Sequence, residues 1–168
     1  MDVSDLLTDA LGRVREQMPD LVAGLDDDDL AWRPDPGANS IAWLVWHLTR
    51  IEDDHVAGVA GTEQVWTADG WAERFDLPFP PAEHGYGMSD ADVDRVRVSG
   101  DLLAGYHDAV AERTASYVAT LTPDDLDRVV DDRWDPPVTL GVRLVSVVNE
   151  VNAHLGQAQY VRGLLERR

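Results

Sequence analysis

Glu150 and His154 lie one helical turn apart and could bind one cation together. Side chains four residues apart leave the same face of an α-helix, and a carboxylate and an imidazole are both ligands for divalent metals. Aliphatic residues such as Val151 and Leu155 surround the pair, and a charged carboxylate is costly there unless it is paired or coordinated. Because Glu and His at this spacing also form ordinary ion pairs, the pair alone does not establish a metal site.

A second histidine, His47, lies in the apolar segment Ile41–Leu48. A lone histidine in such a segment is more often a core residue with satisfied hydrogen bonds. If His47 meets the pair Glu150 and His154 across a helical bundle, two imidazoles and one carboxylate surround a divalent metal and leave a coordination position open. An open position is typical of catalytic metal sites, whereas structural sites are closed by four ligands.

Composition excludes several other kinds of chemistry. The sequence has no cysteine, which rules out disulfides, thiolate ligands and a cysteine nucleophile. Its 32 acidic and 14 basic residues give a formal net charge of -18, and such a surface repels nucleic acid and anionic membranes. The N-terminus does not resemble a secretory signal, and no apolar run is long enough to span a membrane. We therefore expect a cytoplasmic protein that binds neither nucleic acid nor membranes.

Four long helices are predicted to position these residues. Apolar residues spaced by three and four predict helices over residues 3–25, 41–59 and 101–121, and a fourth after Thr139 that ends near residue 166. Asn39 or Ser40 is a suitable N-cap for the second helix. The fourth helix is apolar around most of its circumference and is expected to be central. The length of 168 residues suits one all-α domain, a four-helix bundle over residues 1–168.

The connections are less regular. The acidic run over residues 26–29 is predicted to be a solvated helix exit and turn. Residues 62–99, rich in Trp, Pro and Gly, are predicted to form a long crossover with one short helix near residues 70–75, and a connection of that length is more often functional than idle. Only residues 129–134 have a weak strand pattern.

The segments Trp32–Leu48 and Glu150–Gln157, the latter ending in His-Leu-Gly-Gln, resemble the DinB superfamily. The closer resemblance is to its actinobacterial branch of mycothiol-dependent maleylpyruvate isomerases and mycothiol S-transferases, and it covers nearly the whole chain. It implies a four-helix bundle with a long crossover and a divalent metal, with zinc favoured over nickel, held by the second and fourth helices. The implied ligands are His47, Glu150 and His154. Many family members have histidine at the position of Glu150, whereas the isomerases have glutamate.

The resemblance also implies a chemistry. A metal with an open position binds the sulfur of a low-molecular-weight thiol, such as mycothiol, and lowers its pKa, so that the thiolate attacks a small electrophile. The first hypothesis is therefore a metal-dependent thiol S-transferase or isomerase. Full isomerases carry a further C-terminal domain, so maleylpyruvate isomerisation itself is not expected. The alternative is a non-catalytic bundle with a structural metal site, or one that binds a small molecule or partner. The sequence offers no charge-stabilising group for a hydrolase, and the apolar breadth of the fourth helix allows a homodimer.

Four further residues are predicted to line the pocket or support the ligands: Trp43, Trp46, Asp54 and Gln157. Asp54 follows His47 by seven residues, which places it on nearly the same helix face about 10 Å further along. The other histidines, His55, His84 and His107, are assigned to surface, loop or packing roles. In so acidic a protein, Arg33 and Arg50 are expected to be ion-paired.

Overall fold

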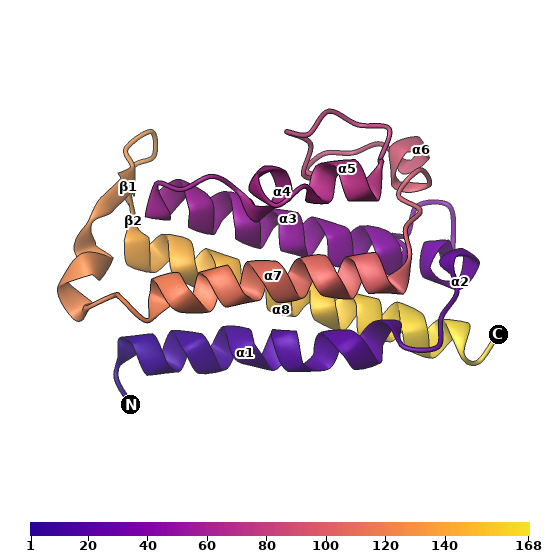
Figure 1. Cartoon of the computed structure of the whole chain (residues 1–168), viewed down its shortest axis with the longest axis horizontal. Helices are drawn as coiled ribbons and strands as arrows, with labels where there is room; N and C mark the ends of the chain where they lie inside the picture. Colours follow the sequence, from indigo (N-terminus) through magenta and orange to yellow (C-terminus); the bar gives the residue numbers. More distant parts are fainter.

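A computed structural model describes all 168 residues and shows four long helices side by side (Figure 1). These helices are α1 (Val3–Val22), α3 (Ile41–Ala60), α7 (Gly100–Val118) and α8 (Leu140–Leu165). Each contacts two others, in the cyclic order α1, α7, α3, α8. The prediction of an all-α four-helix bundle is confirmed. None of the helices is both long enough and apolar enough to cross a membrane.

Short elements fill the connections. α2 (Asp27–Ala31) follows α1, and the crossover between α3 and α7 contains α4 (Val65–Ala68), α5 (Trp71–Phe75) and α6 (Asp90–Val93). Before α8, β1 (Val129–Asp131) and β2 (Val138–Thr139) pair antiparallel, with Val129 opposite Thr139. The long crossover is confirmed, but it contains three short helices where one was predicted.

Hydroxyl and carboxyl caps set the helix boundaries. The Ser40 hydroxyl accepts a hydrogen bond from the backbone N–H of Trp43, so Ser40 rather than Asn39 is the N-cap of α3. α1 ends at Val22 instead of Leu25, because the backbone becomes extended at Ala23, with ψ of 130°, and then turns at Gly24, which has a φ of 75°. The acidic run over residues 26–29 is largely exposed, as predicted, but it begins a short helix instead of a turn. Asp26 caps α2, and the next three aspartates form its first turn, where the helix dipole favours negative charge.

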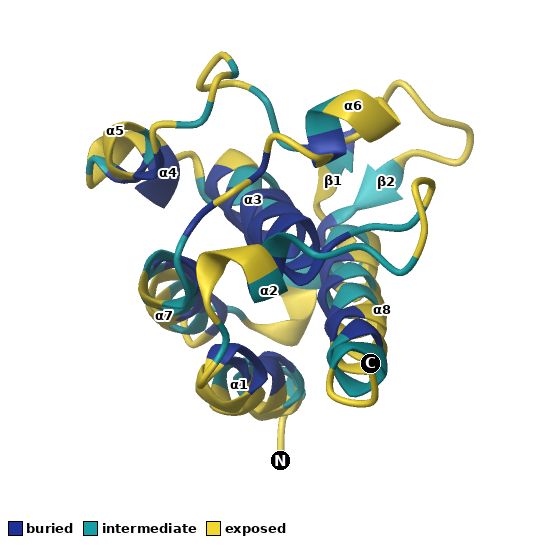
Figure 2. Ribbon diagram, turned by 90° about the vertical axis from the view of Figure 1, so that its right-hand side faces the viewer, coloured by how far each residue is buried: buried dark blue, intermediate teal, exposed yellow.

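The central helix is α3, not α8. Fifteen of the 20 residues of α3 are buried, because α7 and α8 flank it and the crossover covers its outer side (Figure 2). In α8 only seven of 26 residues are buried, and Val142, Val145 and Tyr160 are exposed. The expectation of a central fourth helix is therefore wrong: apolar residues surround α8, but no element covers its outer face.

Candidate metal centre

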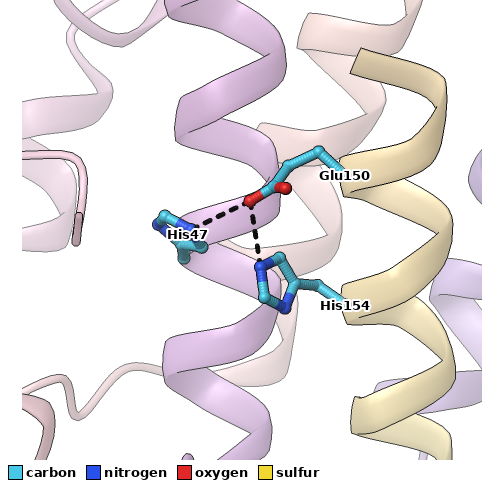
Figure 3. Close-up of side chains that lie close together, drawn as sticks. All are labelled: His47, Glu150 and His154. Atoms are coloured by element: carbon cyan, nitrogen blue, oxygen red, sulfur yellow. Dashed lines mark hydrogen bonds and ion pairs between the residues drawn. The ribbon is translucent and has the colours of Figure 1, made fainter. Parts of the chain in front are cut away.

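The site lies where α3 and α8 run side by side, with His47 facing Glu150 and His154 (Figure 3). His47 Nε2 lies 3.3 Å, and His154 Nε2 3.0 Å, from the same atom, Glu150 Oε1. The three candidate ligand atoms all lie within 4.8 Å of one another, so the cluster could hold one metal ion. His47 is buried, whereas Glu150 and His154 are half-buried. The centre can therefore be reached from outside the bundle.

A second contact of each imidazole determines which nitrogen faces Glu150. His47 Nδ1 lies 2.5 Å from the carbonyl oxygen of His84, which can only accept a hydrogen bond, so this nitrogen carries the proton. His154 Nδ1 lies 2.8 Å from Gln157 Oε1 and donates in the same way. Both Nε2 lone pairs then face a carboxylate oxygen. This arrangement is favourable only with a cation between them, either a metal ion or a proton on one imidazole.

Burial and stacking suit His47 to the role of a metal ligand. Burial lowers the pKa of His47, and the hydrogen bond to His84 and the charge of Glu150 offset part of this effect. The neutral imidazole, which is the form that binds metals, is thus favoured at neutral pH. The Trp43 ring stacks on His47 with centroids 4.5 Å apart and planes 16° apart. This contact restricts rotation of the imidazole.

Residues 81–88 of the crossover, here called the strap, are held against the centre. Gly85 has a φ of 95°, and a Cβ at this position would lie 2.7 Å from His47 Nδ1. Glu83 Oε1 accepts hydrogen bonds from the backbone N–H groups of His84 and Gly85, at 2.9 and 2.7 Å. The Trp43 indole N–H lies 3.3 Å from Met88 Sδ. The strap therefore presents the His84 carbonyl to His47 in a fixed position.

The side chain of Arg50 holds the strap in place. Its buried guanidinium donates hydrogen bonds to the carbonyl oxygens of Pro81 and Glu83, at 3.3 and 3.2 Å. Asp53, 3.8 Å away, balances its charge, so Arg50 is ion-paired as expected. Since the strap in turn orients His47, Arg50 supports the candidate metal centre without touching it.

Replacing Gly85 with Ala is expected to weaken metal binding by about 10-fold to 100-fold, the range typical of losing a partner that orients a ligand. The added Cβ cannot remain 2.7 Å from His47 Nδ1, so the strap and its carbonyl must move. Competition with a chromophoric chelator measures the affinity. Gly87→Ala is the matched control, because Gly87 also has a positive φ, 74°, but has open space around it. Equal affinities in the two variants would contradict the role of the strap.

The other predicted site residues are placed at different distances from the centre. Gln157 contacts His154, Trp43 stacks on His47, and Trp46 packs against Gly85. Asp54 contacts none of the three candidate ligands. It accepts a hydrogen bond from Gln64 at 2.8 Å and faces an open hollow further along α3.

Two features of the site do not follow from sequence reasoning. His84 was predicted to be a loop histidine, yet its backbone carbonyl contacts His47. The role of Gly85 was not predicted, although two glycines within the four residues His-Gly-Tyr-Gly are a signal for unusual backbone geometry.

A second polar cluster lies elsewhere on α3. Glu52 and His107 are buried between α3 and α7, with His107 Nε2 3.8 Å from Glu52 Oε2. Neither nitrogen of His107 has a hydrogen-bond partner, nor does Glu52 Oε1. His107 is thus a core residue, but one whose polar atoms are unsatisfied.

The fold and the site define an all-α bundle protein with a candidate metal centre between two adjacent helices. The chain belongs to the DinB superfamily, whose family model matches residues 10–158. It is also similar to the crystal structure of a conserved protein from Enterococcus faecalis, with a TM-score of 0.93 and 30% sequence identity, over 100% of this chain and 99% of that chain. No curated protein matches the sequence significantly. The superfamily prediction is confirmed by the family match.

Proposed function

We propose that this protein is a divalent-metal-dependent enzyme that activates a low-molecular-weight thiol, of the mycothiol type, for attack on a small electrophile in a transfer or isomerisation reaction. The observation that carries the proposal is the convergence of two imidazole lone pairs and one carboxylate at an accessible point of the bundle. Three protein ligands leave a coordination position for an external ligand. Zinc suits this donor set, and nickel is the second candidate.

The residues around the centre each support this function. When bound, a divalent metal would lower the pKa of a coordinated thiol and keep it as a thiolate at neutral pH. The partners of Nδ1 in both histidines direct Nε2 toward the metal position, so little reorganisation is needed on binding. Trp43 and the strap cover His47 and exclude water from that side. The chain has no cysteine of its own to compete for the metal, so a cosubstrate must supply the nucleophilic sulfur.

A thiol-consumption assay tests the function. Zinc-loaded protein is mixed with mycothiol or 2-mercaptoethanol and 1-chloro-2,4-dinitrobenzene, and the thioether product is followed by absorbance. We expect a metal-dependent rate that falls by at least about 100-fold in His47→Ala, since metal activation contributes several kcal/mol to such reactions. His55→Ala, on the same helix but outside the centre, should keep the wild-type rate.

Circular dichroism confirms that each variant is folded. Stoichiometric metal without thiol consumption, for these and a wider panel of thiols and electrophiles, would contradict the enzyme and favour the alternative of a structural metal site.

A further inference from the structure

A cavity of about 390 Å³, open to solvent, lies next to the metal centre, between α8 and the loop that leads into α3. Gln157 belongs to both, because it lines the cavity and accepts the hydrogen bond of His154 Nδ1. Tyr160 and Leu164 continue the wall along α8, about 9 and 15 Å from His154 along the helix axis. The cavity therefore begins at Gln157, next to His154, and extends toward the C-terminal end of α8.

The walls of this cavity are apolar and carry no positive charge. The apolar lining comes from the loop, from α3 and from α8: Pro34, Ala38, Leu44, Val161 and Leu164. Asn39, Gln157 and Tyr160 add neutral polar groups, and Asp35 is the one charged residue. An anionic ligand would find no cation in this cavity, in a chain whose net charge is already -18. The lining favours a neutral, apolar ligand group.

The loop side of the cavity is fixed by Arg33, whose side chain is only 7% exposed. The guanidinium donates hydrogen bonds to the carbonyl oxygens of Pro36 and Ala38, and it pairs with the carboxylate of Asp94 at 2.6 Å. These contacts tie the loop to the crossover. Because the wall is held in place without a ligand, binding does not have to pay for ordering it.

On the opposite side of the metal centre, the surface is charged instead of apolar. An open hollow of about 690 Å³ lies along α3 and α8 in the other direction, and charged residues such as Asp54, Asp131 and Arg143 line it. Arg143 precedes Glu150 by seven residues, which corresponds to about 10 Å along α8. The centre thus lies between a charged hollow and an apolar cavity.

We infer that the cavity beside Gln157 receives the apolar part, an aryl or branched alkyl group, of a small molecule whose reactive end reaches the metal centre. This inference rests on the proposed function and adds the chemical class of one reactant to it. The volume lies within the range of about 300 to 1,000 Å³ that is usual for small-molecule sites. A phenyl-sized group fits it, with Gln157 between that group and His154.

The test compares two thiols on cobalt-substituted protein, using the sulfur-to-cobalt charge-transfer absorption to measure affinity. Benzyl mercaptan carries a phenyl group, whereas 2-mercaptoethanol has none. We expect wild type to bind benzyl mercaptan about 10-fold more tightly, because the phenyl group leaves water. Leu164→Trp and Ala38→Phe fill the cavity from opposite walls and should reduce this preference to about twofold. Val145→Trp, at a position 65% exposed on α8, should retain it.

Two results would overturn the inference: equal affinities for both thiols in wild type, or an unchanged preference in both filled variants. Two filled variants are used so that misfolding of one does not end the test. If the folded protein binds no cobalt, the proposed function fails instead, and the cavity is tested without metal. Toluene should then shift the methyl resonances of Val161 and Leu164 in metal-free wild type, and unshifted resonances would overturn the inference.

Discussion

Replacing His47 with Ala is expected to abolish stoichiometric metal binding while the bundle stays folded. The variant loses one of three candidate ligands, leaving Glu150 and His154 on a single helix. Two ligands from one helix cannot enclose the ion from both sides, and we expect the dissociation constant to rise on the order of 1,000-fold. Glu150→Ala should have a similar effect, because it leaves two neutral imidazoles without a compensating charge.

Metal analysis of protein purified without chelators, combined with circular dichroism, measures this effect. Truncating buried His47 should lower the free energy of unfolding by about 1 to 3 kcal/mol, the common range for buried substitutions, so the helical spectrum should persist. His55→Ala is the control, since His55 also lies on α3 but pairs with Asp54 at 3.5 Å instead of facing the centre. Near-stoichiometric metal in folded His47→Ala and Glu150→Ala would place the site elsewhere.

The largest change in stability is expected from Glu52→Gln, and only at neutral and alkaline pH. Burial raises the pKa of Glu52 from 4.5 to about 7, the charge of Asp53 adds to the shift, and the nearby Thr114 hydroxyl offsets part of it. Between pH 4.5 and pH 7 the unfolded chain therefore ionises at this position while the folded chain stays protonated. The folded state loses stability across this window, by an amount on the order of 3 kcal/mol. Glutamine removes the ionisation and with it this loss.

Urea denaturation at pH 4.5, 6 and 8 measures the difference. Glu52→Gln should be close to wild type at pH 4.5 and more stable by up to about 3 kcal/mol at pH 8. Glu112→Gln, on the exposed side of α7, should follow the wild-type pH profile. Parallel profiles for Glu52→Gln and wild type would contradict the buried, protonated carboxyl. Metal content should not change, because Glu52 contacts none of the candidate ligands.

His107 makes the stability of the folded state depend on pH in the opposite direction. Burial lowers its pKa from 6.5 to about 4, so the folded state resists protonation that the unfolded chain undergoes. The contribution of this histidine to stability is complete above pH 6.5 and is lost as the pH falls toward 4. The two buried groups thus act in overlapping windows with opposite signs. We therefore expect the free energy of unfolding of wild type to change less with pH than that of Glu52→Gln or of a variant that replaces His107.

Local signals in the sequence are sufficient for the four long helices and for one half of the site. Helix positions follow from apolar spacing and from caps such as Ser40 and Thr139, because these signals involve residues within a few positions of each other. The shared face of Glu150 and His154 follows from helical geometry in the same way. The lack of cysteine restricts the metal donors to imidazole and carboxylate groups. The resemblance to a known family then selects His47 as their partner.

What lies opposite each of these faces depends on how distant segments pack. The apolar spacing of a helix shows which side avoids water but not which element covers it, so the spacing predicts a central α8, whereas α3 is the buried helix. The contact between His47 and the carbonyl of His84 spans 37 residues, and the approach of Glu52 to His107 involves two helices. The path of the crossover, and the packing of one helix on another, bring such groups together. No local pattern encodes these contacts, because they depend on which segments of the chain meet in space.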